Sequence, residues 1–65
     1  MKGNTIGERL RELRGNRTIT EVAEDLGLTK GAISQYELGL RVPSDTVKKE
    51  LARYYNVSVQ ELFFD

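Results

Sequence analysis

The 65-residue sequence contains no cysteine, no histidine and no tryptophan, and only one proline. The lack of cysteine and histidine excludes disulfide bonds, thiolate or imidazole catalysis and the usual zinc ligand sets. No apolar run approaches the ~20 residues that cross a bilayer, and residues 1–4 lack the apolar stretch of a signal peptide. We therefore expect a cytoplasmic protein that needs no metal, no other cofactor and no membrane.

Length and charge restrict the organisation further. A chain of this size buries only about 60% of the surface that its unfolded form exposes. Residues 1–65 are therefore expected to form one domain, without a separate domain for a small-molecule ligand. Ten basic and ten acidic side chains give a formal net charge of zero. Because the total charge gives little support to nucleic-acid binding, a DNA site must depend on how the charges are distributed.

Five short helical segments are predicted, and no stretch alternates polar and apolar residues as a strand would. Three helix starts carry a capping box, a hydroxyl residue followed three positions later by glutamate: Thr5 with Glu8, Thr18 with Glu21, and Ser58 with Glu61. Thr29 and Ser44 are expected N-caps, and Gly27 and Gly39 are expected terminators. The fold class is therefore all-α, with helices near residues 6–14, 19–26, 30–38 and 45–55 and a last turn or two through 59–63.

Residues 19–38 have the spacing of a helix-turn-helix. Apolar positions recur at Val22, Leu26, Leu28, Ile33 and Tyr36. Ala23 must be small where the second helix crosses it, and Gly27 absorbs the tight turn. The polar face of the second helix is then free to enter a major groove about 12 Å wide.

Several segments around this motif resemble the Cro and lambda-repressor-like helix-turn-helix regulators, the Xre family. They are Ile6-Gly-Glu-Arg-Leu-Arg-Glu-Leu-Arg14, Val22-Ala-Glu-Asp-Leu-Gly-Leu28, Ile33-Ser-Gln-Tyr-Glu37, Gly39-Leu-Arg-Val-Pro-Ser44 and Tyr55-Asn-Val-Ser-Val-Gln-Glu-Leu-Phe63. Their order and spacing agree with the family over residues 6–63. The resemblance implies a compact five-helix domain that binds double-stranded DNA.

Site residues follow from the resemblance. The base-facing positions correspond to Thr29, Lys30, Gly31, Ser34 and Gln35, and the phosphate-contacting positions to Arg17, Thr18, Thr20 and Arg41. Gln35 has the groups to bind adenine in bidentate fashion, and Lys30 to approach guanine or a phosphate. Gly31 either allows the helix backbone to approach DNA or marks a position without contact. The family's usual glutamine at the start of the second helix is replaced by Ile19, which puts the phosphate contacts of that corner in doubt.

The resemblance also implies supporting contacts. Arg14 and Glu37 are expected to pair and to orient the second helix of the motif, while Ala23 and Gly27 hold the motif together. The acidic residues Glu21, Glu24 and Asp25 are expected on the solvent side of the first helix of the motif. Tyr54, Phe63 and Phe64 are expected at the interface of a homodimer, which would read two half-sites about 34 Å apart.

The favoured hypothesis is a sequence-specific transcriptional regulator, a repressor in particular. The alternative is a protein interaction module, antitoxin-like or anti-repressor-like, in which the same fold binds another protein and DNA contact is secondary. Zero net charge, Ile19 and Gly31 favour this alternative slightly. An enzyme is not expected, because the sequence offers no nucleophile–base pair, metal cluster or glycine-rich phosphate loop.

Overall fold

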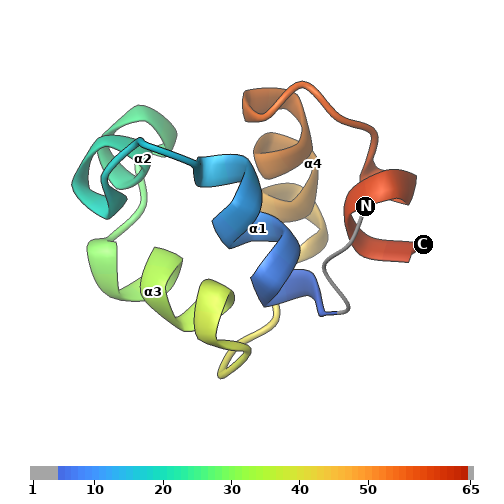
Figure 1. The fold of residues 1–65 in the computed structure, drawn as a ribbon, viewed down its shortest axis with the longest axis horizontal. Coiled ribbons are helices and arrows are strands. Elements are labelled where there is room, and N and C mark those ends of the chain that lie inside the picture. The colour runs from blue at the N-terminus through green and yellow to red at the C-terminus, as the bar shows by residue number, and fades with distance from the viewer. Residues whose placement is uncertain (1–4, 65) are drawn as a thin grey trace.

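Five short helices make up the fold of residues 5–64. A computed structural model describes residues 5–64 and contains α1 (Ile6–Arg14), α2 (Ile19–Leu26), α3 (Lys30–Leu38), α4 (Asp45–Tyr54) and the π-helix η1 (Gln60–Phe64). No strand occurs in that part of the chain, so the predicted all-α fold is confirmed. In Figure 1, α2 and η1 lie at opposite ends of the molecule, with α1 and α4 between them and α3 along the lower edge. The ends of the predicted domain, residues 1–4 and 65, lie outside the described residues.

Side-chain caps determine where the helices begin. At α1, the Glu8 amide donates to the Thr5 hydroxyl over 3.1 Å, and the Thr5 amide donates to the Glu8 carboxylate over 3.2 Å. The same reciprocal bonds join Thr18 with Glu21 at α2 and Ser58 with Glu61 before η1. Hydroxyl N-caps also begin α3 and α4, at Thr29 and Ser44 respectively. Each of the five predicted starts thus satisfies amides that would otherwise lack a partner.

The hydrophobic core lies at the centre of the helices, and Val22, Leu51 and Leu62 are its most completely buried large side chains. Every helix contributes to it. Its members are Leu10, Val22, Ala23, Ala32, Ile33, Tyr36, Leu51, Ala52, Tyr55, Leu62 and Phe63. Burying a leucine or valine contributes about 1.5–3 kcal/mol relative to leaving it exposed. This packing decides which face of each helix is left for solvent or for a partner.

At Gly7, α1 packs directly against the backbone of α3. A Cβ atom placed on Gly7 would lie 2.8 Å from the carbonyl carbon of Glu37 and 3.0 Å from the carbonyl oxygen of Tyr36. Both atoms belong to the backbone and cannot move aside without moving α3. Glycine therefore lets the C-terminal half of α3 lie directly on α1. No role for Gly7 was predicted from the sequence, although a glycine inside a helix indicates a special position, because it costs about 0.5–1 kcal/mol relative to alanine.

The last helix differs from the ordinary α-helical turn that the sequence predicts. Residues Gln60–Phe64 form a wider π-helix in which the sequence neighbours Leu62 and Phe63 are both buried. The last turn of a helix leaves carbonyl groups without intrahelical partners. Here the Arg9 guanidinium on α1 donates to the carbonyls of Leu62 and Glu61 over 3.2 and 3.5 Å. The long-range bond from Arg9 is a tertiary contact that the local sequence pattern does not reveal.

Candidate nucleic-acid interface

Helices α2 and α3 are joined by the three residues Gly27, Leu28 and Thr29. Gly27 adopts a left-handed conformation with φ 69°, where a side chain would be strained. The amide of Leu28 then donates to the carbonyl of Ala23 over 2.9 Å, which closes the turn. Ala23 is 2% exposed beneath this crossing. Of the two residues predicted to support the motif, Gly27 therefore lies at its turn and Ala23 is buried in the core.

Helix α3 has one buried face and one exposed face. Its Ala32, Ile33 and Tyr36 side chains belong to the core. On the other side, Lys30, Gly31 and Gln35 are exposed and Ser34 is half-buried. Residues three or four apart lie next to one another on a helix, so these four form one continuous surface. Thr29 is exposed just before them, and its hydroxyl accepts the amide of Ala32 over 3.1 Å.

The surface at Gly31 is open. No protein atom lies within 4 Å of a Cβ atom placed on this residue. The protein itself therefore places no steric demand for glycine at this position, in contrast to Gly7. The two explanations of Gly31, close approach of DNA or absence of contact, both remain compatible with this open space.

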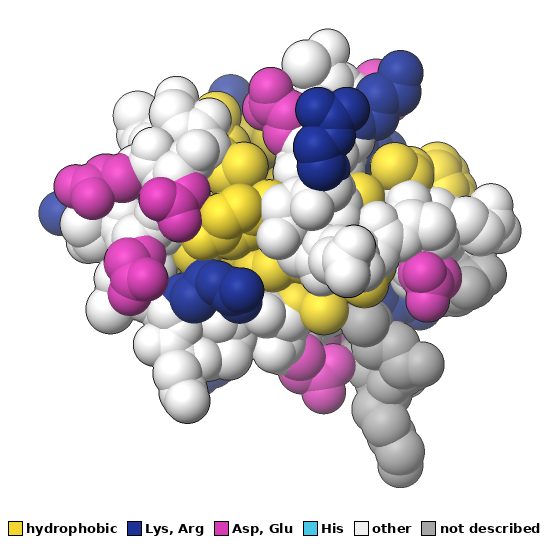
Figure 2. Space-filling view, turned by 90° about the horizontal axis from the view of Figure 1, so that it is seen from above, with side chains coloured by type: hydrophobic (Ala, Val, Ile, Leu, Met, Phe, Trp, Pro, Cys, Tyr) yellow, Lys and Arg dark blue, Asp and Glu magenta, His cyan; other side chains and the backbone are white. Residues whose placement is uncertain are grey.

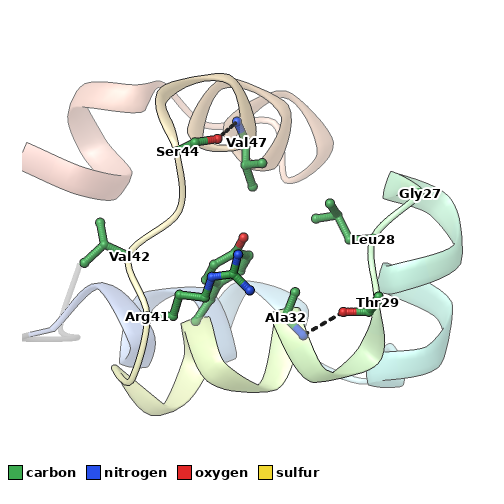
Figure 3. A pocket seen from close by; sticks show the side chains of 9 residues that line it. Gly27, Leu28, Thr29, Ala32, Arg41, Val42, Ser44 and Val47 are labelled. Carbon is green, nitrogen blue, oxygen red and sulfur yellow. Dashed lines mark hydrogen bonds between the residues drawn. The ribbon is translucent and has the colours of Figure 1, made fainter.

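Arg41, in the loop after α3, lies beside Tyr36 of that helix. Its guanidinium carbon is 5.9 Å from the centre of the Tyr36 ring, within cation–π range. It lines a hollow that extends along Leu28, Thr29 and Ala32 to Ser44 and Val47, and Figure 3 shows its side chain directed into this hollow. A positive charge thus lies in the hollow between the loop after α3, α3 itself and the start of α4.

The three residues expected to bind phosphate at the start of α2 have different surroundings. Thr18 is exposed, but its amide and hydroxyl are both engaged with Glu21 in the capping box. Thr20 is exposed on the first turn of α2. The Arg17 guanidinium lies over the rings of Tyr54 and Tyr55, at 5.4 and 5.8 Å from their centres, and donates to the Leu13 carbonyl over 3.3 Å. Arg17 is therefore turned toward the C-terminal end of α4, an arrangement that sequence reasoning missed.

Arg14 and Glu37 form a bidentate ion pair between α1 and α3. The Arg14 Nε and Nη2 groups donate to the Glu37 carboxylate over 2.8 and 3.1 Å, and the two side chains are 18% and 7% exposed. The hydrogen bond to Glu37 raises the pKa of Arg14 above its usual value. A further Arg14 nitrogen donates to the Arg17 carbonyl over 2.8 Å. One guanidinium thus connects α1, the loop before α2 and the end of α3.

Sequence reasoning also missed Arg11. This exposed residue lines a hollow between α1, the start of α2 and α3, together with Ile19, Ser34 and Leu38. It precedes Arg14 by three residues, so the two arginines lie on the same side of α1. This three-residue spacing is visible in the sequence and could have identified Arg11 as a candidate. Arg11 supplies a cation at the corner where the family's usual glutamine is replaced by Ile19.

The structure does not assemble the expected dimer edge of Tyr54, Phe63 and Phe64. Phe63 is 7% exposed and belongs to the core, which corrects its predicted place at an interface. The Tyr54 hydroxyl donates to Asp25 of α2 over 2.6 Å, whereas Phe64 lies beside Lys48, whose ammonium nitrogen is 5.6 Å from its ring centre. Because α2 and η1 are at opposite ends of the molecule (Figure 1), Tyr54 and Phe64 do not share an edge. Phe64 alone, at 65% exposure, remains an exposed aromatic residue.

The acidic residues of α2 lie away from the exposed surface of α3. Glu21, Glu24 and Asp25 are all exposed. Figure 2 looks onto the face of the molecule opposite α3 and shows acidic side chains gathered at its α2 end. Among residues 5–64, no helix combines the length and the apolar character that crossing a membrane requires. The same residues contain no cluster of acidic side chains arranged to hold a metal ion.

Comparison with known proteins agrees with this geometry. A model of the helix-turn-helix family matches residues 8–62, which include all of α2, α3 and α4. A search of curated proteins found no match to the chain. The matched range covers the motif together with the helices that support it, and not the motif alone. The chain therefore belongs to the Xre, or lambda-repressor-like, family of helix-turn-helix DNA-binding regulators.

Proposed function

We propose that the protein is a sequence-specific repressor that inserts α3 into the major groove of a two-fold symmetric operator. The observation that carries this proposal is the division of α3 into a buried face and an exposed face of Lys30, Gly31, Ser34 and Gln35. The buried face and the Arg14–Glu37 pair hold the helix in one orientation. Repression requires only that the bound protein occlude the operator, which a single small domain in the cytoplasm can achieve without a cofactor.

In this proposal, contacts to bases and contacts to phosphates have different tasks. The base edges are contacted by Gln35, Lys30, Ser34 and Thr29. A good bidentate contact disfavours the wrong base by about 1–3 kcal/mol. Arg41 and the added Arg11 attract the DNA backbone on either side of α3. Arg17 reaches a phosphate only by leaving the two tyrosine rings, and Thr18 and Thr20 assist at the start of α2.

The first experiment is selection of random duplexes by the purified protein at near-physiological salt, followed by sequencing of the bound pool. We expect a two-fold symmetric motif. Gln35→Ala should then lose about 1–3 kcal/mol on the selected sequence and little on random DNA. Arg41→Ala should weaken binding to both and reduce the slope of affinity against salt by about one.

Arg53→Ala is the matched control, because Arg53 is an exposed cation on α4 near Asp25 and Tyr54, away from α3. It should leave sequence preference unchanged. A pool that stays random, or equal binding by all three variants, would refute the proposed roles.

The second candidate is a protein interaction module. It is favoured by the exposed apolar side chains Leu38, Leu40 and Val42, which are 66%, 74% and 70% exposed. A random selected pool, combined with specific binding of a protein through these side chains, would support this candidate over the repressor.

A further inference from the structure

A hollow of about 500 Å³ lies between the α2–α3 turn, α3, the loop after α3 and the start of α4. Sites for small molecules have volumes of about 300–1,000 Å³, so the hollow is large enough for such a ligand. Figure 3 shows Leu28 and Thr29 on its α2–α3 side and Ser44 and Val47 on its α4 side. The chain is too short for a separate ligand domain, but this hollow lies within the single domain itself.

The side chains around this hollow offer hydrogen-bond donors and apolar surface. Arg41 is directed into it and supplies one positive charge (Figure 3). The hydroxyls of Thr29 and Ser44 each accept the backbone amide that they cap, over 3.1 and 3.3 Å, so each keeps its proton for a further acceptor. Of the described residues that line the hollow, none is acidic. The apolar lining side chains are Leu28, Ala32, Val42 and Val47.

Tyr36 of α3 also lines this hollow, and its hydroxyl lacks a partner. The residue is 6% exposed, and its ring lies under Arg41, with the guanidinium carbon 5.9 Å from the ring centre. No hydrogen bond joins this hydroxyl to another group of residues 5–64. Every fully enclosed side-chain oxygen or nitrogen in the same residues has a partner, so the hydroxyl remains accessible to an incoming molecule. Polar groups this deeply placed are normally hydrogen-bonded, which points to a ligand beside Arg41.

We propose that this hollow binds a small carboxylate that carries an apolar body. The carboxylate accepts hydrogen bonds from the Arg41 guanidinium and the Tyr36 hydroxyl, and bonds of an ionised pair are the stronger kind. The apolar body covers Leu28, Val42 and Val47, and its contribution grows with the apolar area removed from water. Val42, which is 70% exposed in the free protein, is covered in this way.

Charge and shape favour a carboxylate over a phosphate. The hollow is lined by one cationic side chain, Arg41, which balances the single charge of a carboxylate. A phosphate monoester carries about 1.5–2 negative charges at pH 7. A phosphate of the DNA backbone carries a single charge, but it has no apolar body to cover the apolar side chains of the hollow.

A ligand in this hollow affects DNA binding through Arg41. The same side chain is proposed to attract the DNA backbone, so a bound carboxylate removes a charge that DNA would use. Ligand and DNA therefore weaken each other's binding by the same factor. This regulatory consequence rests on the proposed function, whereas binding of the carboxylate to the free protein does not.

The test is titration of the ¹⁵N-labelled protein, without DNA and at constant ionic strength, with benzoate as the probe. Amide signals of Thr29, Tyr36, Arg41 and Ser44 should shift and saturate, with a Kd in about the millimolar range for so small a ligand. Benzamide has the ring without the charge, and inorganic phosphate has the charge without the ring. Each should bind about tenfold more weakly or worse.

Tyr36→Phe isolates the hydroxyl, because it keeps the buried ring and the contact with Arg41. Its Tm should not fall, since the hydroxyl has no partner within residues 5–64. Its affinity for benzoate should be about threefold to tenfold lower, and that of Arg41→Gln about tenfold lower or worse. Tyr55→Phe is the matched control, because Tyr55 is 9% exposed and lies under Arg17, away from the hollow. It should bind benzoate as the parent does.

The inference is overturned if benzoate causes no saturable shifts, if benzamide or phosphate binds as tightly, or if Tyr36→Phe keeps the parent's affinity. On the duplex selected by the parent, saturating benzoate should weaken binding severalfold, and it should have little effect on Arg41→Gln. Unchanged DNA affinity in the parent would overturn the regulatory consequence. If the parent selects no DNA sequence, it is the proposed function that fails, and the titration still decides whether the hollow binds a carboxylate.

Discussion

Gly7 of α1 and Gly31 of α3 have opposite surroundings. Gly7 lies against the backbone of α3, whereas Gly31 has open space where a side chain would be. Replacement by alanine therefore tests two different things. At Gly7 it tests packing within the protein, and at Gly31 it tests how closely DNA approaches the helix.

Gly7→Ala should destabilise the fold by about 1–3 kcal/mol, because the added methyl group forces α1 and α3 apart. Gly31→Ala should stabilise the fold by up to about 1 kcal/mol, since alanine favours the helix and meets no protein atom. On the duplex selected by the parent, Gly31→Ala should nevertheless bind about tenfold more weakly if the helix backbone approaches the bases. Urea unfolding and titration of labelled duplex measure the two effects separately.

Unchanged affinity in a stabilised Gly31→Ala protein would show that residue 31 makes no contact with DNA. An unchanged free energy of unfolding in Gly7→Ala would show that α1 and α3 can separate at this crossing without cost.

At the scale of helices, the Arg14–Glu37 pair joins α1 to the end of α3. Glu37 is 7% exposed, so removal of Arg14 leaves a nearly buried carboxylate without its partner. Arg14→Ala should therefore cost about 3 kcal/mol of unfolding free energy. The double variant Arg14→Met/Glu37→Leu should recover most of that loss, because apolar side chains of similar size need no charge partner. Urea unfolding of the parent, Arg14→Met, Glu37→Leu and the double variant gives the coupling energy; if the two single costs simply add, the pair does not act as a unit.

The helices themselves could largely be predicted from the sequence. Thr5, Thr18, Thr29 and Ser44 act locally, each capping an amide three residues away, so their effect can be recognised without knowing the fold. The spacing of buried side chains in α3 is equally local, which is why its exposed surface was anticipated.

What could not be predicted depends on contacts between distant segments. Phe63 and Phe64 are alike in sequence, yet only Phe63 is buried, because η1 is a wide turn with its carbonyls held by Arg9. Arg17 is drawn onto Tyr54 and Tyr55, about 37 residues along the chain, and not toward the start of α2. The positions of Phe63 and Arg17 depend on how α1 and α4 pack, and they cannot be predicted from the pattern of charged residues alone.

At the scale of the whole molecule, stability should fall at alkaline pH. Burial raises the pKa of Tyr55 from 10.0 to about 12, and the Glu37 carboxylate adds to the effect. The hydrogen bond to Asp25, followed by burial, raises the pKa of Tyr54 in the same direction. A folded protein that keeps a proton more tightly than the unfolded chain gains stability below the unfolded pKa. This contribution is complete below pH 10 and is lost as the pH rises from 10 toward 12.

The predicted loss is about 1.4 kcal/mol per pH unit from Tyr55 within that window, and at most about 2–3 kcal/mol in total. Other contributions to stability also change at alkaline pH, so the parent must be compared with Tyr55→Phe, which lacks the titrating hydroxyl and keeps the buried ring. Urea unfolding from pH 8 to pH 11 should give a shallower decline for Tyr55→Phe than for the parent. Tyr54→Phe, which loses the bond to Asp25 at the surface, should fall between them. Equal slopes for the parent and Tyr55→Phe would mean that Tyr55 ionises in the folded protein as easily as in the unfolded chain.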